Sequence, residues 1–147
     1  MERERKLNTL LAQAGVKTDT TTGALTTPLH FSTTYQHPEF GQSTGYDYTR
    51  TKNPTRASLE ETLAAIESAD YALATSSGMS AIVLAFSAFP VGSKVLAVRD
   101  LYGGSFRWFA QVEAEGRFAF TYANTEEDLL NNLTEDIDIV YIETPTN

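Results

Sequence analysis

From residue 71 onwards the sequence alternates between strand-like and helix-like segments, and this order limits the fold more than any other feature. Short apolar runs predict four strands, at Tyr71–Thr75, Lys94–Arg99, Arg117–Tyr122 and Ile137–Glu143. Apolar residues at helical spacing predict three intervening helices, at Met79–Phe89, Ser105–Glu115 and Leu129–Leu133, and Thr125–Asp128 resembles a capping box that opens the last of them. Strands that alternate with helices form parallel sheets covered by helices on both faces. We therefore expect an α/β fold that binds ligands at the carboxyl ends of its strands.

The first third of the chain is organised differently. Leu7–Ala14 has the apolar spacing of a helix that Gly15 can close. Residues 16–49 are rich in Thr, Ser, Gly and aromatic residues without a sustained period, which predicts an extended arm rather than a packed element. Asn53 and Pro54 then provide the cap and first residue of another helix. A loop as long as this arm is usually functional or contacts another molecule.

Composition excludes several classes of function. The chain has 147 residues and a net charge of -8, from 11 basic and 19 acidic residues, which argues against non-specific binding of nucleic acid. The absence of cysteine excludes a disulfide framework, and only two histidines argue against a His-rich metal site. No apolar run is long enough to span a membrane, and the charged start does not resemble a secretory signal. We expect a cytoplasmic protein that binds neither metal nor membrane.

Two segments have the residue types that bind phosphate. Ser77, Gly78 and Met79 follow a predicted strand and open a predicted helix, where free backbone N–H groups attract anions. The alternative is an ordinary turn with a serine cap. Tyr48 and Arg50 combine a phenol with a guanidinium, which binds phosphate through two parallel hydrogen bonds. The alternative there is a solvated basic turn before the next helix.

Two further segments lie just after predicted strands. Tyr102 precedes two glycines that allow close approach, so its ring is a candidate for stacking on a flat heteroaromatic ligand. Arg107, in the next helical turn, is a candidate for binding a carboxylate. The alternative makes Tyr102 a core ring and Arg107 a surface charge. Asn147 offers a side-chain amide to a ligand oxygen, but Glu143–Asn147 also has the composition of a simple turn.

Five motifs, taken in order, resemble the pyridoxal-phosphate enzymes of cysteine and methionine metabolism, the transsulfuration family. They are Tyr46–Arg50, Asn53–Arg56, Ser76–Ala81, Asp100–Gly104 and Glu143–Asn147. The resemblance covers nearly all of this chain but under half of a typical member. It implies a truncated, N-terminal part of a fold-type I enzyme. Residues 1–52 would form a helix and an intersubunit arm, and residues 53–147 the first part of the cofactor-binding domain.

The resemblance also implies roles for single residues. Ser77, Gly78 and Met79 match the turn that holds the phosphate of pyridoxal 5′-phosphate, mainly through backbone amides. Tyr48 and Arg50 match residues that reach the phosphate in a neighbouring subunit, which implies a homo-oligomer, a dimer of dimers with shared active sites.

Three residues are implied to act on the ring or the substrate. Tyr102 matches the ring that stacks on the pyridine and assists proton transfer, which makes it the catalytic candidate. Asn147 matches the residue near the ring hydroxyl and the α-carboxylate of the amino-acid substrate. Arg107 matches an arginine that binds a distal carboxylate in members acting at the γ-carbon.

The implied reaction replaces the γ-substituent of an activated homoserine ester with cysteine or sulfide, as cystathionine γ-synthases do in methionine biosynthesis. A cystathionine β-lyase or γ-lyase is the alternative within the family. A stand-alone phosphate- or nucleotide-binding α/β module, or a structural subunit that pairs with a full-length relative, are alternatives from other classes. The lysines, Lys6, Lys17, Lys52 and Lys94, all lie outside the Ser-x-Thr-Lys context of the lysine that forms the Schiff base. We therefore expect this chain alone to be inactive.

Overall fold

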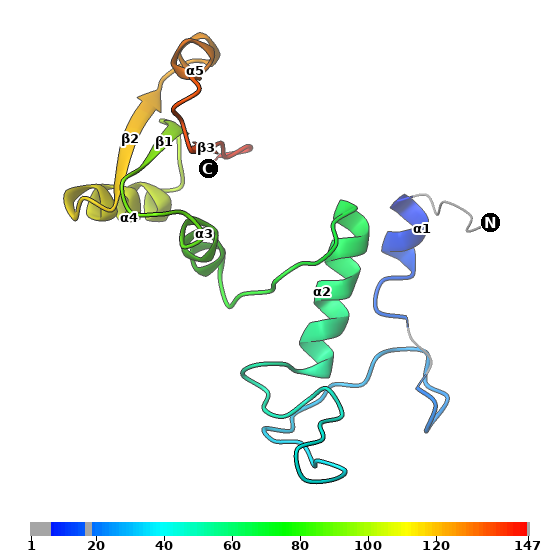
Figure 1. Cartoon of the computed structure of the whole chain (residues 1–147). Coiled ribbons are helices and arrows are strands. Elements are labelled where there is room, and N and C mark those ends of the chain that lie inside the picture. Colours follow the sequence, from blue (N-terminus) through cyan, green and yellow to red (C-terminus); the bar gives the residue numbers. More distant parts are fainter. Residues whose placement is uncertain (1–6, 17–18, 147) are drawn as a thin grey trace. The chain divides into compact units, whose positions relative to one another are not determined.

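Two compact units, Met1–Ala74 and Thr75–Asn147, divide the chain. The computed structural model describes residues 7–16 and 19–146, shown as a ribbon in Figure 1. Within those ranges no helix combines the length and the apolar character needed to cross a membrane. The division expected after residue 52, between an intersubunit arm and a cofactor domain, stays a prediction.

The first unit contains helix α1 (Leu7–Ala12) and helix α2 (Pro54–Glu67), which pack against each other (Figure 1). The predicted start of α2 is confirmed: Oδ1 of Asn53 accepts a hydrogen bond from the backbone N–H of Thr55 at 2.8 Å, and Pro54 is the first helical residue. A proline there loses nothing, because the first N–H groups of a helix have no acceptor within it. Helix α1 is shorter than predicted and is followed by Gly15 at a φ of 69°.

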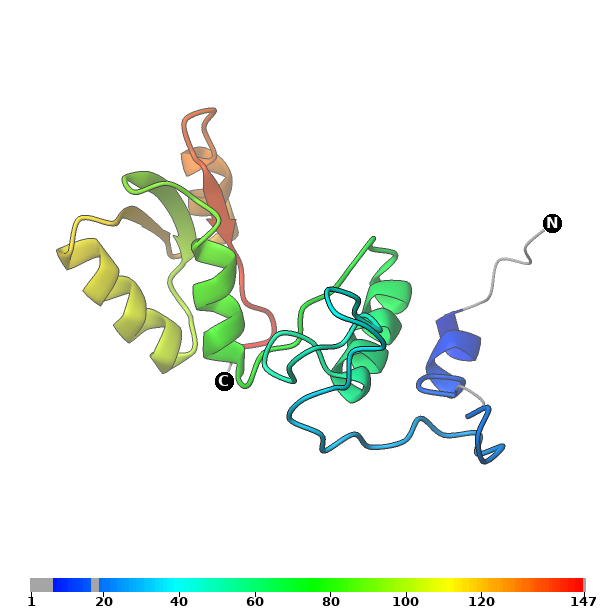
Figure 2. The same cartoon turned by 60° about the horizontal axis from the view of Figure 1, so that its bottom comes forward.

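The arm between α1 and α2 folds back on itself, whereas the sequence predicted an extended segment. Thr34 and Tyr48 form an antiparallel bridge, and the N–H of Thr49 donates to the carbonyl of Thr33 at 2.9 Å. Nδ2 of Asn53 donates to Oγ1 of Thr49 at 2.6 Å, which ties the arm to the start of α2. Figure 2 shows the arm looping beside α2. Backbone groups need hydrogen-bond partners, and the arm supplies many of its own.

The strand predicted at Tyr71–Thr75 is wrong, because this segment has no secondary structure. Tyr71 and Leu73 are 78% and 64% exposed, and the N–H of Ala74 donates to the carboxylate of Glu60 at 3.0 Å instead of to a neighbouring strand. A strand is held by its partner, and within the described residues none pairs with this segment. An apolar run alone cannot supply that partner.

The second unit is an α/β layer structure that confirms the predicted fold class. Its elements are α3 (Gly78–Phe86), β1 (Ser93–Val98), α4 (Gly103–Ala114), β2 (Phe118–Ala123), α5 (Glu126–Asn132) and β3 (Ile139–Tyr141). The three strands are parallel in the order β2-β1-β3, with Val95 opposite both Phe120 and Ile139. β3 is shorter than predicted. Thr125 caps α5, as the sequence predicted, by accepting a hydrogen bond from the N–H of Asp128.

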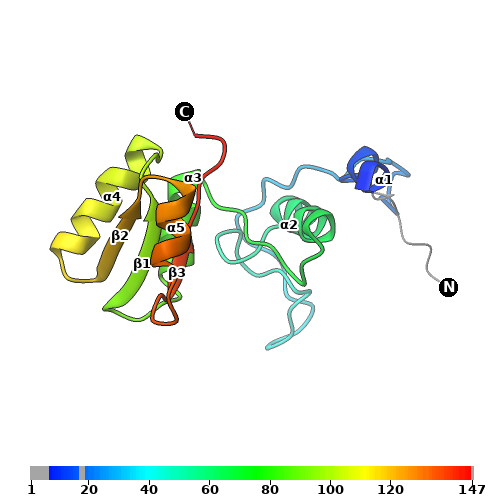
Figure 3. The same ribbon diagram turned by 90° about the horizontal axis from the view of Figure 1, so that it is seen from above.

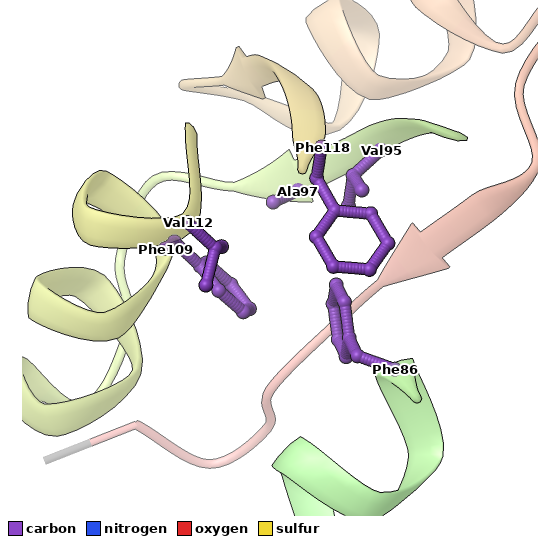
Figure 4. Close-up of a cluster of buried hydrophobic side chains, with 6 residues drawn as sticks. All are labelled: Phe86, Val95, Ala97, Phe109, Val112 and Phe118. Carbon is purple, nitrogen blue, oxygen red and sulfur yellow. The ribbon is translucent and has the colours of Figure 1, made fainter. Parts of the chain in front are cut away.

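The core lies between the sheet and two helices. Figure 4 shows Phe86 of α3 and Phe109 and Val112 of α4 converging on three sheet residues, Val95, Ala97 and Phe118. Leu96 is also fully buried, and alternation along β1 directs it to the opposite face. Helix α5 packs against β1 and β2 on that face, as Figure 3 shows from above. Helices therefore cover both faces, and the carboxyl ends of β1 and β3 open near the start of α3.

Candidate functional site

Helix α3 begins with two unpaired backbone donors. Ser77 is its N-cap, and Oγ of Ser77 accepts a hydrogen bond from the N–H of Ser80 at 3.1 Å. The N–H groups of Gly78 and Met79 have no acceptor within the helix and none elsewhere among the described residues. They point out of a helix end that carries a partial positive charge, so this end of α3 can bind an anion.

The loop after β1 places an aromatic ring beside this helix start. Tyr102 is the N-cap residue of α4, and its side chain is 45% exposed, so it is not a core ring. A Cβ atom added to Gly104 would lie 2.4 Å from Cε1 of Tyr102 and 3.2 Å from Sδ of Met79. The ring of Tyr102 therefore lies over the first turn of α4, next to a residue of α3.

The segment after β3 places a carboxylate, that of Glu143, beside Tyr102. Oε1 of Glu143 accepts a hydrogen bond from the N–H of Tyr102 at 3.2 Å, and Oε2 accepts one from the hydroxyl of Tyr141 at 3.3 Å. Burial, together with the charge of Glu143, raises the pKa of Tyr141 above its ordinary value of 10.0. The hydroxyl is protonated at neutral pH and can donate this bond.

These groups surround one open pocket of about 510 Å³ in the second unit. It is lined by Ser77, Gly78, Met79, Ile82, Tyr102, Ser105, Tyr141 and Glu143. Four of the residues predicted from sequence are thus brought together: Ser77, Gly78, Met79 and Tyr102. Sequence reasoning did not select Glu143 as a site residue, although a carboxylate so soon after a strand is a signal for the ligand-binding edge of a parallel sheet.

Arg107 and Asn147 are not placed in this pocket. Arg107 is exposed, and its Nη1 lies 3.3 Å from where a Cβ on Gly103 would stand, at the first turn of α4. No carboxylate in the described ranges forms an ion pair with it. Asn147 lies outside the described residues. Both roles stay predictions.

Tyr48 and Arg50, in the first unit, contact each other directly. Nη2 of Arg50 donates to the hydroxyl of Tyr48 at 3.3 Å, and the guanidinium lies over that ring, 5.4 Å from its centroid. The basic residue that supports the turn before α2 is a different one, Arg56, whose Nη2 donates to the carbonyl of Thr51 at 2.8 Å. Arg50 has no carboxylate partner in the described part of the chain. Its charge is available to an external anion.

Comparison with known proteins identifies the family. The sequence model of the Cys/Met metabolism PLP-dependent enzymes matches residues 8–147. The chain belongs to this family. Among curated members, the cystathionine gamma-synthase/O-acetylhomoserine (thiol)-lyase of Bacillus subtilis is 41% identical over 96% of this chain and 38% of its own length. A cystathionine gamma-lyase of Dictyostelium discoideum is 39% identical over 97% of this chain and 38% of its own length.

Solved structures of the family agree with the fold. The cystathionine gamma synthase of Xanthomonas oryzae pv. oryzae in complex with cystathionine superposes with a TM-score of 0.89 and is 36% identical, covering 99% of this chain and 38% of that one. The chain thus spans about 38% of the length of the relatives it matches. The match to the N-terminal part of these enzymes confirms the predicted fold class, the start of a fold-type I enzyme.

The pocket residues fit the family's cofactor, pyridoxal 5′-phosphate. The unpaired N–H groups of Gly78 and Met79 suit its phosphate, and the half-exposed ring of Tyr102 offers a flat face to its pyridine. The pocket volume also lies within the range of roughly 300–1,000 Å³ that is common for small-molecule sites.

Neither described lysine lines the pocket. Lys94 lies near the amino end of β1, the end away from Tyr102, and pairs with Asp136. Lys52 lies in the first unit with its Nζ over the ring of Tyr46. Lys6 and Lys17 lie outside the described residues. The expectation that this chain lacks the Schiff-base lysine stays a prediction.

Proposed function

We propose that this chain supplies the phosphate- and ring-binding part of the pyridoxal-phosphate site in a cystathionine γ-synthase-like protein. The whole protein would replace the γ-substituent of an activated homoserine ester with cysteine or sulfide. One observation carries the proposal: a single pocket brings the free amides of Gly78 and Met79 next to the exposed ring of Tyr102. Family membership supplies the cofactor that such a pocket fits.

Each pocket group has a distinct task in this proposal. The N–H groups of Gly78 and Met79 bind the phosphate, and the dipole of α3 favours its charge. The ring of Tyr102 stacks on the pyridine and sets its orientation, and the phenol holds a proton near the reacting carbon. When bound, pyridoxal phosphate would supply an electron sink for the electron pair left when a bond at the substrate's α-carbon breaks.

Tyr48 and Arg50 would complete the site in a neighbouring subunit of a homo-oligomer, a dimer of dimers. Their mutual contact supports this role, as does the absence of a carboxylate partner for Arg50 among residues 7–16 and 19–146. In the whole protein, Arg50→Ala removes a charged hydrogen bond to the phosphate and should weaken cofactor retention by about 1.5–3 kcal/mol. Unchanged affinity in equilibrium dialysis would argue against a shared site.

The lyase reactions form the second candidate, because relatives named as γ-lyases and β-lyases also match nearly all of the chain. Arg107, in the second turn of α4, favours a substrate with a distal carboxylate and hence a γ-acting enzyme. Assays of the whole protein separate the candidates. Cystathionine formed from a homoserine ester and cysteine supports the synthase, whereas release of pyruvate or 2-oxobutyrate from cystathionine identifies a β-lyase or a γ-lyase.

Binding to the 147-residue chain tests the pocket itself. Pyridoxamine 5′-phosphate is the suitable probe, because it has the ring and the phosphate but no aldehyde to react with stray amines. We expect it to bind more tightly than pyridoxamine without phosphate, and Tyr102→Ala to weaken it. The matched control is Tyr71→Ala, which removes an exposed tyrosine outside the pocket. Binding of ATP in place of pyridoxamine 5′-phosphate would instead support a nucleotide-binding module.

A further inference from the structure

Glu143 connects two loops that belong to neighbouring strands. It lies two residues beyond the end of β3, and its Oε1 accepts the hydrogen bond from the N–H of Tyr102, four residues beyond the end of β1. Its Oε2 accepts the hydrogen bond from the hydroxyl of Tyr141. One carboxylate thus has each of its oxygens on a different partner, and it also lines the pocket.

The bond to Tyr102 takes the place of a local helix cap. In a capping box, the third residue of a helix accepts a hydrogen bond from the N–H of the N-cap residue. The third residue of α4 is Ser105, whose buried hydroxyl instead contacts Sδ of Met79, at 3.9 Å, and the hydroxyl of Tyr141. Glu143, 41 residues along the chain from Tyr102, provides the missing acceptor.

A second contact joins the same two loops. Oγ1 of Thr146 donates to Oδ2 of Asp100 at 2.8 Å. The bond between Thr146 and Asp100 joins the two loops at a residue that precedes Tyr102. The bond accepted by Glu143, in contrast, is made by Tyr102 itself. The two contacts therefore provide a matched pair of changes, of which only one acts on Tyr102 directly.

We propose that Glu143 is a positioning residue for ligand binding: its carboxylate holds the backbone of Tyr102 so that the ring faces the pocket. This inference rests on the proposed function of the pocket, and it assigns to Glu143 a role that operates through Tyr102. This role requires an acceptor oxygen within reach of the Tyr102 N–H and does not require a charge. Glutamine keeps such an oxygen and therefore preserves the role, whereas alanine has none and abolishes it.

Amide exchange in the 147-residue chain tests the contact without any ligand. We expect Glu143→Ala to speed exchange of the Tyr102 N–H about tenfold in NMR spectra, since one hydrogen bond is lost. Glu143→Gln should stay near the wild-type rate. Asp100→Ala is the control that cuts the other contact, and it should change the Tyr102 rate less than Glu143→Ala does. Unaltered protection in Glu143→Ala, or equal losses in the alanine and glutamine variants, would overturn the proposal.

Ligand titration then separates this inference from the function on which it rests. Shifts of the Gly78 and Met79 amides report binding of inorganic phosphate and of pyridoxamine 5′-phosphate. Glu143→Ala should weaken binding of pyridoxamine 5′-phosphate severalfold relative to inorganic phosphate, and Glu143→Gln, which removes the same charge, should restore that ratio. If wild type binds pyridoxamine 5′-phosphate and Glu143→Ala binds it equally well, the positioning role is refuted. If wild type does not bind it, the proposed function fails instead, and the positioning role fails with it.

Discussion

The ring of Tyr102 occupies the space that a side chain at Gly104 would need. A Cβ at residue 104 would stand 2.4 Å from the ring, closer than Cβ atoms approach in real structures, and in a tight contact of 3.2 Å with Sδ of Met79. Gly104 is needed here because of this packing and not because of an unusual backbone angle, since its φ is not positive. The position of the ring therefore depends on the absence of a single methyl group.

Gly104→Ala should push the ring of Tyr102 away from Met79. We expect the Met79 methyl resonance to lose the shift caused by the nearby ring, and binding of pyridoxamine 5′-phosphate to weaken. Gly103→Ala is the matched control, because a Cβ at residue 103 would meet only the flexible end of Arg107, at 3.3 Å. An unchanged Met79 methyl resonance in Gly104→Ala would contradict the packing described above.

The core of the second unit should depend strongly on Phe109. This side chain is fully buried, stacks on Phe120 at 4.6 Å and meets Tyr141 edge-on at 5.0 Å. Phe109→Ala should lower the free energy of unfolding by about 3–5 kcal/mol, because it removes contacts and leaves a cavity. Urea unfolding followed by the fluorescence of Trp108 measures the loss. Phe106→Ala, on the same helix but 43% exposed, should cost clearly less, and equal losses would contradict this core.

The ion pair between Lys94 and Asp136 should stabilise the fold only above acidic pH. The hydrogen bond from Lys94 lowers the pKa of Asp136 from 3.8 to about 2. A carboxyl group with a lowered pKa contributes its stability in full above pH 3.8 and loses it as the pH falls through 2. The difference in unfolding free energy between wild type and Asp136→Asn should shrink over that range.

The effect of this pair should be small, because both side chains are exposed to solvent. The same contact raises the pKa of Lys94 above 10.5, so at the alkaline end its contribution is lost only as the pH rises through that raised value. A difference between wild type and Asp136→Asn that is constant from pH 6 to pH 2 would argue against the pair.

Asn53 should couple the arm to helix α2 through the two ends of its amide. Oδ1 caps the helix, and Nδ2 donates to Oγ1 of Thr49 and to the carbonyl of His30. Asn53→Asp keeps the cap but replaces the Nδ2 donor with an oxygen, which cannot bond to the carbonyl of His30, and this loss should cost about 1 kcal/mol. Hydrogen exchange should accelerate in residues 30–49 and remain slow in residues 54–67. Uniform acceleration in both segments would show that the cap itself was lost.

Sequence reasoning predicted elements best where local patterns decide them. The cap residues Asn53 and Thr125 predict where α2 and α5 begin, and a run of apolar residues predicts the buried strand β1. Tyr71–Thr75 carries the same apolar signal yet forms no strand, because a strand also needs a neighbour to bond with. The fold of the arm was not predicted for a related reason. The bridge between Thr34 and Tyr48 joins two segments that have no periodic pattern, so the sequence does not indicate that they pair.

The candidate site could be predicted from the sequence where the order of strands and helices brings its residues together. Tyr102 and Glu143 meet because they follow the neighbouring parallel strands β1 and β3, whereas Ser77–Met79 reaches the same place because α3 packs against α4. The contact of Glu143 with Tyr102 spans 41 residues and joins a side chain to a backbone group, so no local pattern reveals it. The roles of Arg107 and Asn147, and of Tyr48 and Arg50 in a neighbouring subunit, stay predictions.

The contact between Tyr48 and Arg50 bears on how an oligomer would assemble. A long, flexible arginine normally loses rotamer freedom when it meets an anion, and that loss weakens association. Here the guanidinium already rests on an aromatic face and shares a hydrogen bond with its hydroxyl before any second subunit arrives. Much of the rotamer freedom of Arg50 is therefore already lost in the isolated chain. A phosphate from a second subunit would meet the guanidinium of Arg50 and the hydroxyl of Tyr48 already held together.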